Sequence, residues 1–208
     1  MRNDIEIEKR PRGRPRGFDA QQALERMLTT FWDRGYAATS LDQLALAAGL
    51  NRPSLYAAFG DKKAMYRAAL DAFAERTRSE VSAALQGPSL VTALRRFYRG
   101  AINIYLSGNE GPRGCLYVCT AAVEAVQHVE IRGDLLEILR VIDAALAARI
   151  AAAQAAGEIA RDRNAGELGM LAAAILHSIA IRARAGAGRR QLEGMARLVV
   201  DLICTPAA

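Results

Sequence analysis

The segment covering residues 39–62 constrains the fold most, because it encodes two short helices separated by a tight turn. Ser40 can cap the first helix, and Gln43 three positions later completes a capping box. Gly49 stands where the chain must leave that helix with a positive φ, which glycine adopts at little steric cost. Asn51 is a good N-cap for the second helix. This spacing predicts a helix-turn-helix, the element that places its second helix in the major groove of DNA.

The second helix of this pair is expected to present a docking face. Proline in the first turn is harmless, because its missing N–H would have no helical partner there. The apolar positions of the helix point inward and leave a compact face of mixed polarity, whereas a solvated helix normally carries longer charged side chains. A plain hairpin in a helical bundle is the alternative. The outward positions are Arg52, Pro53, Ser54, Tyr56 and Ala57.

A basic arm precedes this module. Residues 9–16, KRPRGRPR, contain five basic residues and no acid, and their prolines and glycine oppose a helix. Such an arm can order along phosphates and release counterions. Its Arg-Gly-Arg-Pro core resembles an AT-hook, which lays arginines along a narrow minor groove. We expect Arg12, Arg14 and Arg16 to contact DNA; the alternative is a passive solubilising tail.

Residues 13–70 resemble the DNA-binding domain of the TetR/AcrR family of bacterial transcriptional regulators. In the C-terminal half, Gly114-Cys115-Leu116, Thr120-Ala121 and residues 183–186 are similar to the branch of that family containing the YxaF and LmrA repressors. The N-terminal resemblance rests on residues 13–16 (GRPR), Phe31, Gly35-Tyr36, Thr39-Ser40, Ala45, Gly49, Leu55-Tyr56, Phe59 and Lys62.

The resemblance implies a role for each matching position, and the local chemistry supports it. Arg52 and Ser54 would approach base edges, since arginine is the commonest reader of guanine. A hydroxyl at a helix N-terminus can hold a phosphate together with the backbone N–H groups. The implied phosphate contacts are Thr39, Ser40, Tyr56 and Lys62.

Composition agrees with a nucleic-acid partner, since the net charge is +6 and the pI about 9.6. The N-terminus is charged and lacks the apolar core of a signal peptide. The longest strongly apolar stretch, residues 168–181, is expected to be too short to span a bilayer, and it contains His177. We therefore expect a soluble cytoplasmic protein with no membrane partner. With two histidines and no nucleophile-elbow, phosphate-loop or metal-hydrolase motif, an enzyme is disfavoured and no cofactor is predicted.

The chain is predicted to be all-α, with about nine helices and no strands. An arm (1–17) would precede a three-helix helix-turn-helix domain (18–65) and a helical effector-binding and dimerisation domain (66–208). Outside the helix-turn-helix, the expected helices cover residues 19–34, 61–85, 89–106, 115–127, 131–156, 164–184 and 189–204.

The last two helices carry apolar stripes that must be buried somewhere. We expect a two-fold four-helix interface between subunits, which the family resemblance also implies; burial within one subunit is the alternative. A homodimer would hold its recognition helices about 34 Å apart, one turn of DNA, and so bind a palindromic operator. The expected interface residues are Leu171, Ile175, Ile179, Arg182, Leu192, Met195, Leu198, Val199 and Leu202.

The other C-terminal helices could enclose an apolar pocket for a small, mostly hydrophobic effector, although such stripes are often plain core. The resemblance implies that the effector shifts the helix at 61–85 and releases the DNA, with repression as the family default. The expected lining residues are Phe97, Ile104, Tyr105, Tyr117, Val123, Val126, Ile142 and Ile175.

Two other regulatory hypotheses stay open. Cys115 and Cys119 are four positions apart and would stack on one helix face, where they could bind a soft metal or be oxidised as a sensor. A metal would need more ligands, and His128 is more than two turns away, so no metal site is predicted and core packing is preferred. The other hypothesis is an architectural DNA-binding protein without an effector.

Overall fold

The computed structural model describes residues 18–108 and 111–204, and within these ranges the chain is helical with no strand. This confirms the predicted all-α class and nine helices. A π-helical turn, η1 (Tyr117–Ala121), runs directly into α6. The helices are α1 (Ala20–Arg34), α2 (Leu41–Ala48), α3 (Arg52–Phe59), α4 (Lys62–Leu85), α5 (Leu90–Tyr105), α6 (Ala122–Glu124), α7 (Val129–Ala155), α8 (Ala165–Arg184) and α9 (Arg189–Ile203).

Local capping explains where the N-terminal helices begin. The Asp19 carboxylate accepts from the N–H groups of the first turn of α1, and Ser40 and Gln43 form the expected capping box on α2. The Asn51 side chain accepts from the N–H of Ser54 at the start of α3. These helix starts depend on neighbours in sequence.

The largest departure from the expected helices lies at residues 115–127. Five of these residues, Tyr117–Ala121, form a π-helical turn, and the helix stops at Glu124. Within it the N–H of Ala122 donates to the carbonyl of Tyr117, an i→i+5 bond. Because such a turn holds an extra residue, each later side chain is rotated by about 100° from its α-helical direction.

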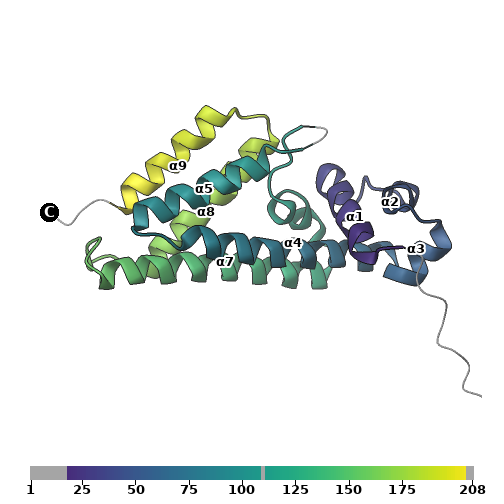
Figure 1. Cartoon of the computed structure of the whole chain (residues 1–208), viewed down its shortest axis with the longest axis horizontal. Coiled ribbons are helices and arrows are strands. Elements are labelled where there is room, and N and C mark those ends of the chain that lie inside the picture. Colours follow the sequence, from purple (N-terminus) through teal and green to yellow (C-terminus); the bar gives the residue numbers. More distant parts are fainter. Residues whose placement is uncertain (1–17, 109–110, 205–208) are drawn as a thin grey trace, which may run out of the picture.

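The molecule is elongated, with α1, α2 and α3 at one end and α5, α7, α8 and α9 at the other (Figure 1). Helix α4 belongs to both parts: α1 packs on its first half, and α5 and α7 of the other part also contact it. Phe31 of α1 meets Tyr66 of α4 edge to face at 5.0 Å, and Trp32 meets Phe73 at 4.7 Å. These aromatic contacts fix the N-terminal module onto α4.

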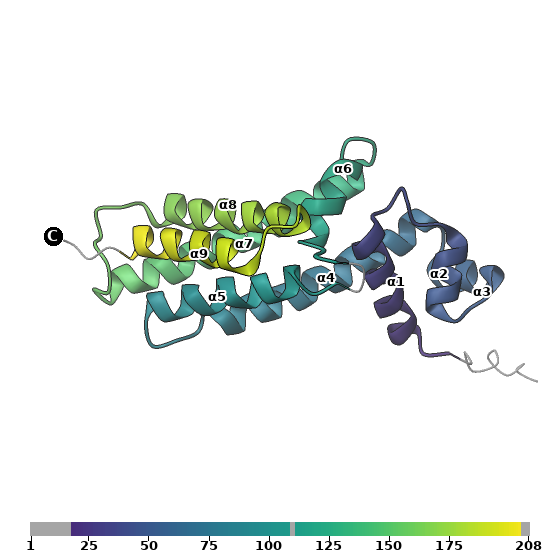
Figure 2. The same cartoon turned by 90° about the horizontal axis from the view of Figure 1, so that it is seen from above.

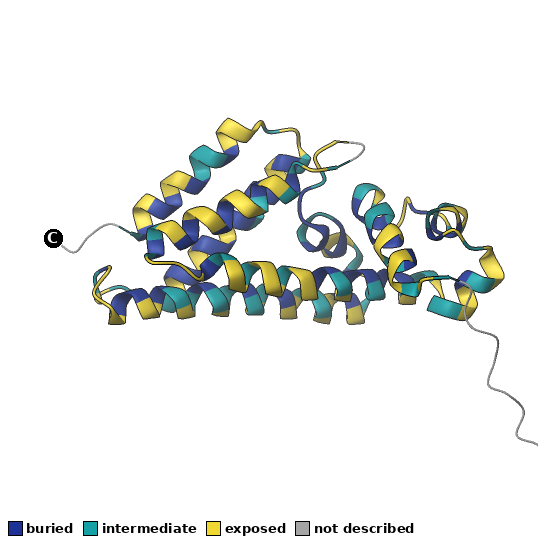
Figure 3. Ribbon diagram, in the orientation of Figure 1, coloured by how far each residue is buried: buried dark blue, intermediate teal, exposed yellow. Residues whose placement is uncertain are grey.

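Helix α8 contacts α5, α7 and α9 in the C-terminal part and, seen from above, lies along one side of it (Figure 2). Its twenty residues are long and apolar enough, by length and composition alone, to cross a membrane, although the strongly apolar stretch expected at 168–181 is shorter. One side of this helix packs against neighbouring helices, and its other side carries exposed residues. Buried residues face the interior of the bundle and exposed residues face outward (Figure 3).

Candidate nucleic-acid interface and internal cavity

The turn between α2 and α3 has the geometry that its residues predict. Gly49 adopts φ 69° and ψ 31°, and its N–H donates back to the end of α2. Leu55 is fully buried and holds α3 against the module. Arg52, Pro53 and Tyr56 are exposed, and Ser54 is half-buried. One face of α3 is therefore open to a large partner.

Arg52 is already engaged on this face. Its Nε and Nη2 atoms each donate to a carboxylate oxygen of Asp42 on α2 at 2.6 Å. The hydrogen bonds from Arg52 lower the pKa of the Asp42 carboxyl and raise the pKa of the guanidinium. Both side chains are exposed, at 54% and 73%, so the pair is weak and open to exchange. Asp42 was not among the expected site residues, because its pairing with Arg52 depends on how α2 and α3 pack together.

Thr39 does not match its expected role. The residue is 1% exposed, and its hydroxyl donates to the carbonyl of Gly35 at 2.6 Å, so this hydroxyl is not available to a phosphate. Ser40 next to it is exposed, although its oxygen accepts from the Gln43 N–H. Of the two phosphate contacts expected at this helix start, only Ser40 therefore remains a candidate.

Lys62, at the start of α4, lies against Tyr36. Its Nζ is 4.5 Å from the ring centroid and donates to the Ala37 carbonyl at 3.5 Å. Partial burial lowers the pKa of Lys62. The expected arm contacts Arg12, Arg14 and Arg16 lie outside the described residues.

A cavity of about 340 Å³ lies between α4, α5, η1, α7 and α8. Five of the expected residues line it: Phe97, Ile104, Tyr105, Tyr117 and Ile142.

Three expected lining residues do not line this cavity. Val123 and Val126 are 70% and 77% exposed: Val123 follows the π-helical turn, which rotates later side chains, and Val126 lies in the turn beyond the end of α6. Ile175 is half-buried outside the lining, while the next two residues of α8, Leu176 and His177, face the cavity. One helical step rotates a side chain by about 100°, which suffices to turn it from one wall to another.

Two polar residues that line the cavity, His177 and Cys115, were not among the expected lining residues. Nε2 of His177 is buried without a hydrogen-bond partner, and burial lowers the pKa of its imidazole. Cys115 lines the cavity, and burial raises the pKa of its thiol to about 11. Cys119 lies outside the lining, with Sγ 3.7 Å from the Ala180 carbonyl oxygen. The described residues contain no cluster of three or more His, Cys, Asp or Glu suited to a metal.

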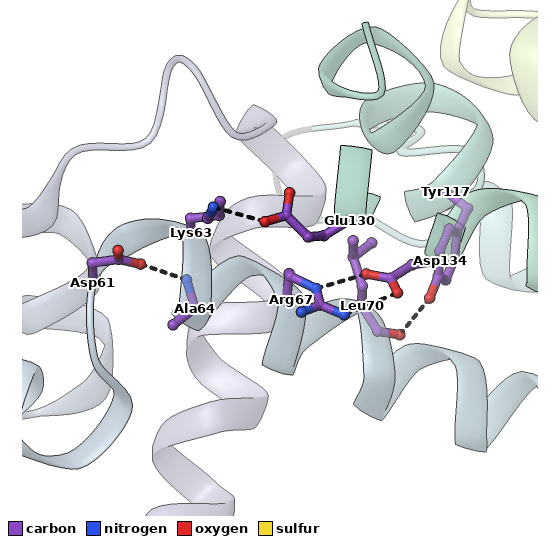
Figure 4. A network of polar contacts seen from close by, with 8 residues as sticks. All are labelled: Asp61, Lys63, Ala64, Arg67, Leu70, Tyr117, Glu130 and Asp134. Carbon is purple, nitrogen blue, oxygen red and sulfur yellow. Dashed lines mark hydrogen bonds and ion pairs between the residues drawn. The ribbon is translucent and has the colours of Figure 1, made fainter. Parts of the chain in front are cut away.

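Ion pairs connect α7 to the first half of α4 (Figure 4). Lys63 contacts Glu130 at 3.2 Å, and Arg67 donates to both carboxylate oxygens of Asp134 at 2.8 and 3.1 Å. These contacts join the end of α4 beside the DNA-reading module to the helix that forms one wall of the cavity.

Hydrogen bonds connect η1 to the same stretch of α4. The Tyr117 hydroxyl, from the cavity wall, donates to the Leu70 carbonyl at 3.2 Å (Figure 4). The hydroxyls of Tyr66 and Thr120 are hydrogen-bonded at 2.7 Å in the interior. Any change in the wall at η1 therefore acts directly on α4.

The expected dimer-interface residues divide into two groups. Ile179, Leu192 and Val199 are buried within the subunit, so for these three the alternative of internal core packing holds. Their stripes face neighbouring helices of the same chain. The remaining members are exposed or half-buried: Leu171, Ile175, Arg182, Met195, Leu198 and Leu202.

Sequence comparison finds two matching family models. The model of bacterial regulatory proteins of the tetR family matches residues 24–69, and that of the tetracyclin repressor-like C-terminal domain matches residues 91–199. The HTH-type transcriptional repressor ComR of Escherichia coli K12 is 30% identical over 196 residues, 93% of each chain. BdcR of the same organism, also an HTH-type transcriptional repressor, is 31% identical over 109 residues, about half of each chain.

Solved structures show the same architecture. A cysteine mutant of the TetR family regulator CifR, complexed with 26-bp double-strand operator DNA, matches with a TM-score of 0.78 and 30% identity over 90% of this chain and 98% of that one. Reduced NemR of E. coli also has a TM-score of 0.78, over 91% of this chain and 99% of that one, and at 18% identity it supports the fold alone.

Proposed function

Because this chain belongs to the TetR family of bacterial transcriptional regulators and is not an enzyme, we propose that it is a ligand-released repressor. As a homodimer it would bind a palindromic operator in the cytoplasm. A small, mostly hydrophobic molecule in the cavity would then weaken that binding.

The observation that carries this proposal is the continuity of α4. Its 24 residues run unbroken from Lys62, beside the DNA-reading module, to Leu85, and on the way Phe73, Val81 and Ala84 form part of the cavity wall. A ligand can shift the equilibrium only if it binds the DNA-incompetent arrangement more tightly. A rigid helix shared by both sites supplies the physical connection for such a difference.

The relatives support repression and not activation. ComR and BdcR are named transcriptional repressors, and the similar CifR structure contains operator DNA. The alternative hypotheses have less support. A thiol sensor needs a ready thiolate, whereas burial raises the pKa of both Cys115 and Cys119. An architectural DNA-binding protein would not need a cavity that is connected to its helix-turn-helix.

Binding to the DNA between this gene and its neighbour tests the proposal. We expect the wild-type protein to bind one site there, and Arg52→Ala to weaken that binding about 10- to 100-fold, the range for losing a bidentate base contact. Fluorescence anisotropy with labelled duplexes measures the affinity. Arg140→Ala, which removes an exposed arginine from α7, should leave it unchanged. Equal affinity of the Arg52→Ala variant and the wild type would contradict the assignment of α3 as the reader.

A further inference from the structure

The cavity suits a compact and predominantly hydrophobic molecule. Its volume of about 340 Å³ lies near the lower end of known ligand sites, about 300 to 1,000 Å³. Phe97 and Ile104 of α5, Ile138 and Ile142 of α7 and Leu176 of α8 form apolar parts of its wall. A polar molecule would lose most of its hydration in this cavity without gaining hydrogen bonds to compensate.

Three polar side chains of the wall are already hydrogen-bonded. The Tyr117 hydroxyl donates to the Leu70 carbonyl, and the side chains of Tyr105 and Cys115 are hydrogen-bonded to each other. These groups contribute shape and apolar surface more than free hydrogen-bonding capacity.

His177 differs from its neighbours in the wall. Nε2 has no hydrogen-bond partner although it is buried, and among described side chains only Arg113 has another such nitrogen. A buried nitrogen without a hydrogen-bond partner destabilises the protein, and a ligand with a matching group would restore the missing hydrogen bond. The imidazole is therefore the polar group of the cavity that is best placed to recognise a ligand.

The charges around the cavity disfavour an ionic ligand. Burial lowers the pKa of His177, so its imidazole is neutral near pH 7 and offers no charge to a carboxylate or an amine. The charged lining residues Arg76 and Glu80 are exposed at the rim, and Arg76 lies 3.9 Å from the Glu25 carboxylate. An ionised group inside would be desolvated without a partner of opposite charge.

We infer that the effector is a compact, uncharged, mostly hydrophobic molecule with one hydroxyl group, which hydrogen-bonds to Nε2 of His177. A hydroxyl both donates and accepts, so it matches either tautomer of a neutral imidazole. The inference rests on the proposed function of this cavity as the effector site.

Calorimetric titration of the full-length protein with 1-octanol, octanoate and octylammonium tests the inference. These probes share a chain and differ only in the polar end. We expect 1-octanol to bind at least about tenfold more tightly than either ion, and His177→Phe to weaken 1-octanol about tenfold by removing one hydrogen bond. His177→Gln, which keeps a hydrogen-bonding group, should restore part of the affinity, and circular dichroism checks that both variants fold.

Three results would overturn the inference: no binding of 1-octanol, equal binding by His177→Phe, or octanoate binding as tightly as 1-octanol. Release of operator DNA is measured separately with the same probes. If 1-octanol binds through His177 and the DNA stays bound, the ligand class stands and the proposed regulatory function fails. If octanoate releases the DNA instead, the function stands and the ligand class fails.

Discussion

Arg52 and Asp42 illustrate how single residues can prepare the proposed DNA-facing surface. The carboxylate occupies the guanidinium fork with two hydrogen bonds of 2.6 Å and so holds it extended between α2 and α3. A base edge or a phosphate offers the same pair of acceptors. Since exposed ion pairs contribute little, DNA can replace Asp42 at small cost, and the arginine is pre-oriented for that exchange.

His177 should make stability depend on pH. Because burial lowers its pKa in the folded chain, the unfolded chain binds this proton more readily, so stability is complete above the unfolded pKa of about 6.5 and falls as the pH drops below it. Urea unfolding at fixed protein concentration from about pH 7.5 to about pH 5 measures the slope. His177→Gln should flatten it, and parallel curves for the two proteins would contradict the assignment.

Among the secondary-structure elements, the backbone conformation of the segment before η1 depends on one glycine. Gly114 has φ +63°, and a Cβ there would lie 2.6 Å from the Ala180 carbonyl oxygen and 2.7 Å from Sγ of Cys119. Its own carbonyl accepts from Nε1 of Trp32 at 3.0 Å. The glycine therefore lets α1, η1 and α8 meet at one point.

Gly114→Ala should consequently destabilise the protein by about 2 to 4 kcal/mol, because it combines overpacking with an unfavourable φ. Urea unfolding monitored by circular dichroism gives the free energy. Gly133→Ala is the matched control: this glycine lies exposed within α7 with nothing near its Cβ position, so alanine should add about 0.5 to 1 kcal/mol. Equal effects of the two substitutions would show that the close approach at Gly114 is unimportant.

The sequence predicted those elements best that depend on near neighbours. The caps at Ser40 and Asn51 and the turn at Gly49 are local, so the helix-turn-helix could be derived in detail. The π-helical turn could not, because residues distant in sequence contribute to it: Thr120 is hydrogen-bonded to Tyr66 of α4. The misassignment of Val123 followed from that turn, and that of Val126 from the early end of the helix at Glu124.

The sequence predicted which face of a helix carries apolar residues, but it did not predict what that face contacts in the folded chain. A stripe shows that a side chain is apolar, and the packing of other helices decides whether it meets a cavity, the core or solvent. Ile179 and Val199 illustrate this, since both are buried inside the subunit while Leu198 is 72% exposed. Thr39 was misjudged for a similar reason: its burial depends on how the chain after α1 packs.

At the scale of the whole molecule, an apolar surface on α8 and α9 remains uncovered in the single chain. Large exposed apolar side chains are costly in water and mark contact sites when they cluster. Their position on the two terminal helices supports the proposed homodimer. The exposed members are Met170, Leu171, Ile181, Leu198 and Leu202.

Replacing Leu198 and Leu202 together by glutamate should produce a folded monomer, since a two-fold contact would bury the new carboxylates without partners. Size exclusion with light scattering reports the mass. Operator affinity should fall by at least about 100-fold, because the second half-site no longer binds intramolecularly. Leu136→Glu, at an exposed leucine of α7, is the control and should remain dimeric. A dimeric double variant would place the interface elsewhere.

The continuity of α4 also sets a mechanical scale. A helix of 24 residues is about 36 Å long, so a tilt of about 5° around one end moves the other by about 3 Å. The cavity lies along the C-terminal half of α4, and Lys62 is at the N-terminal end of the helix. A displacement of about one bond length at the wall would therefore be multiplied at the DNA. In the proposed dimer, we therefore expect even a ligand as small as this cavity admits to misalign the two recognition helices on one operator.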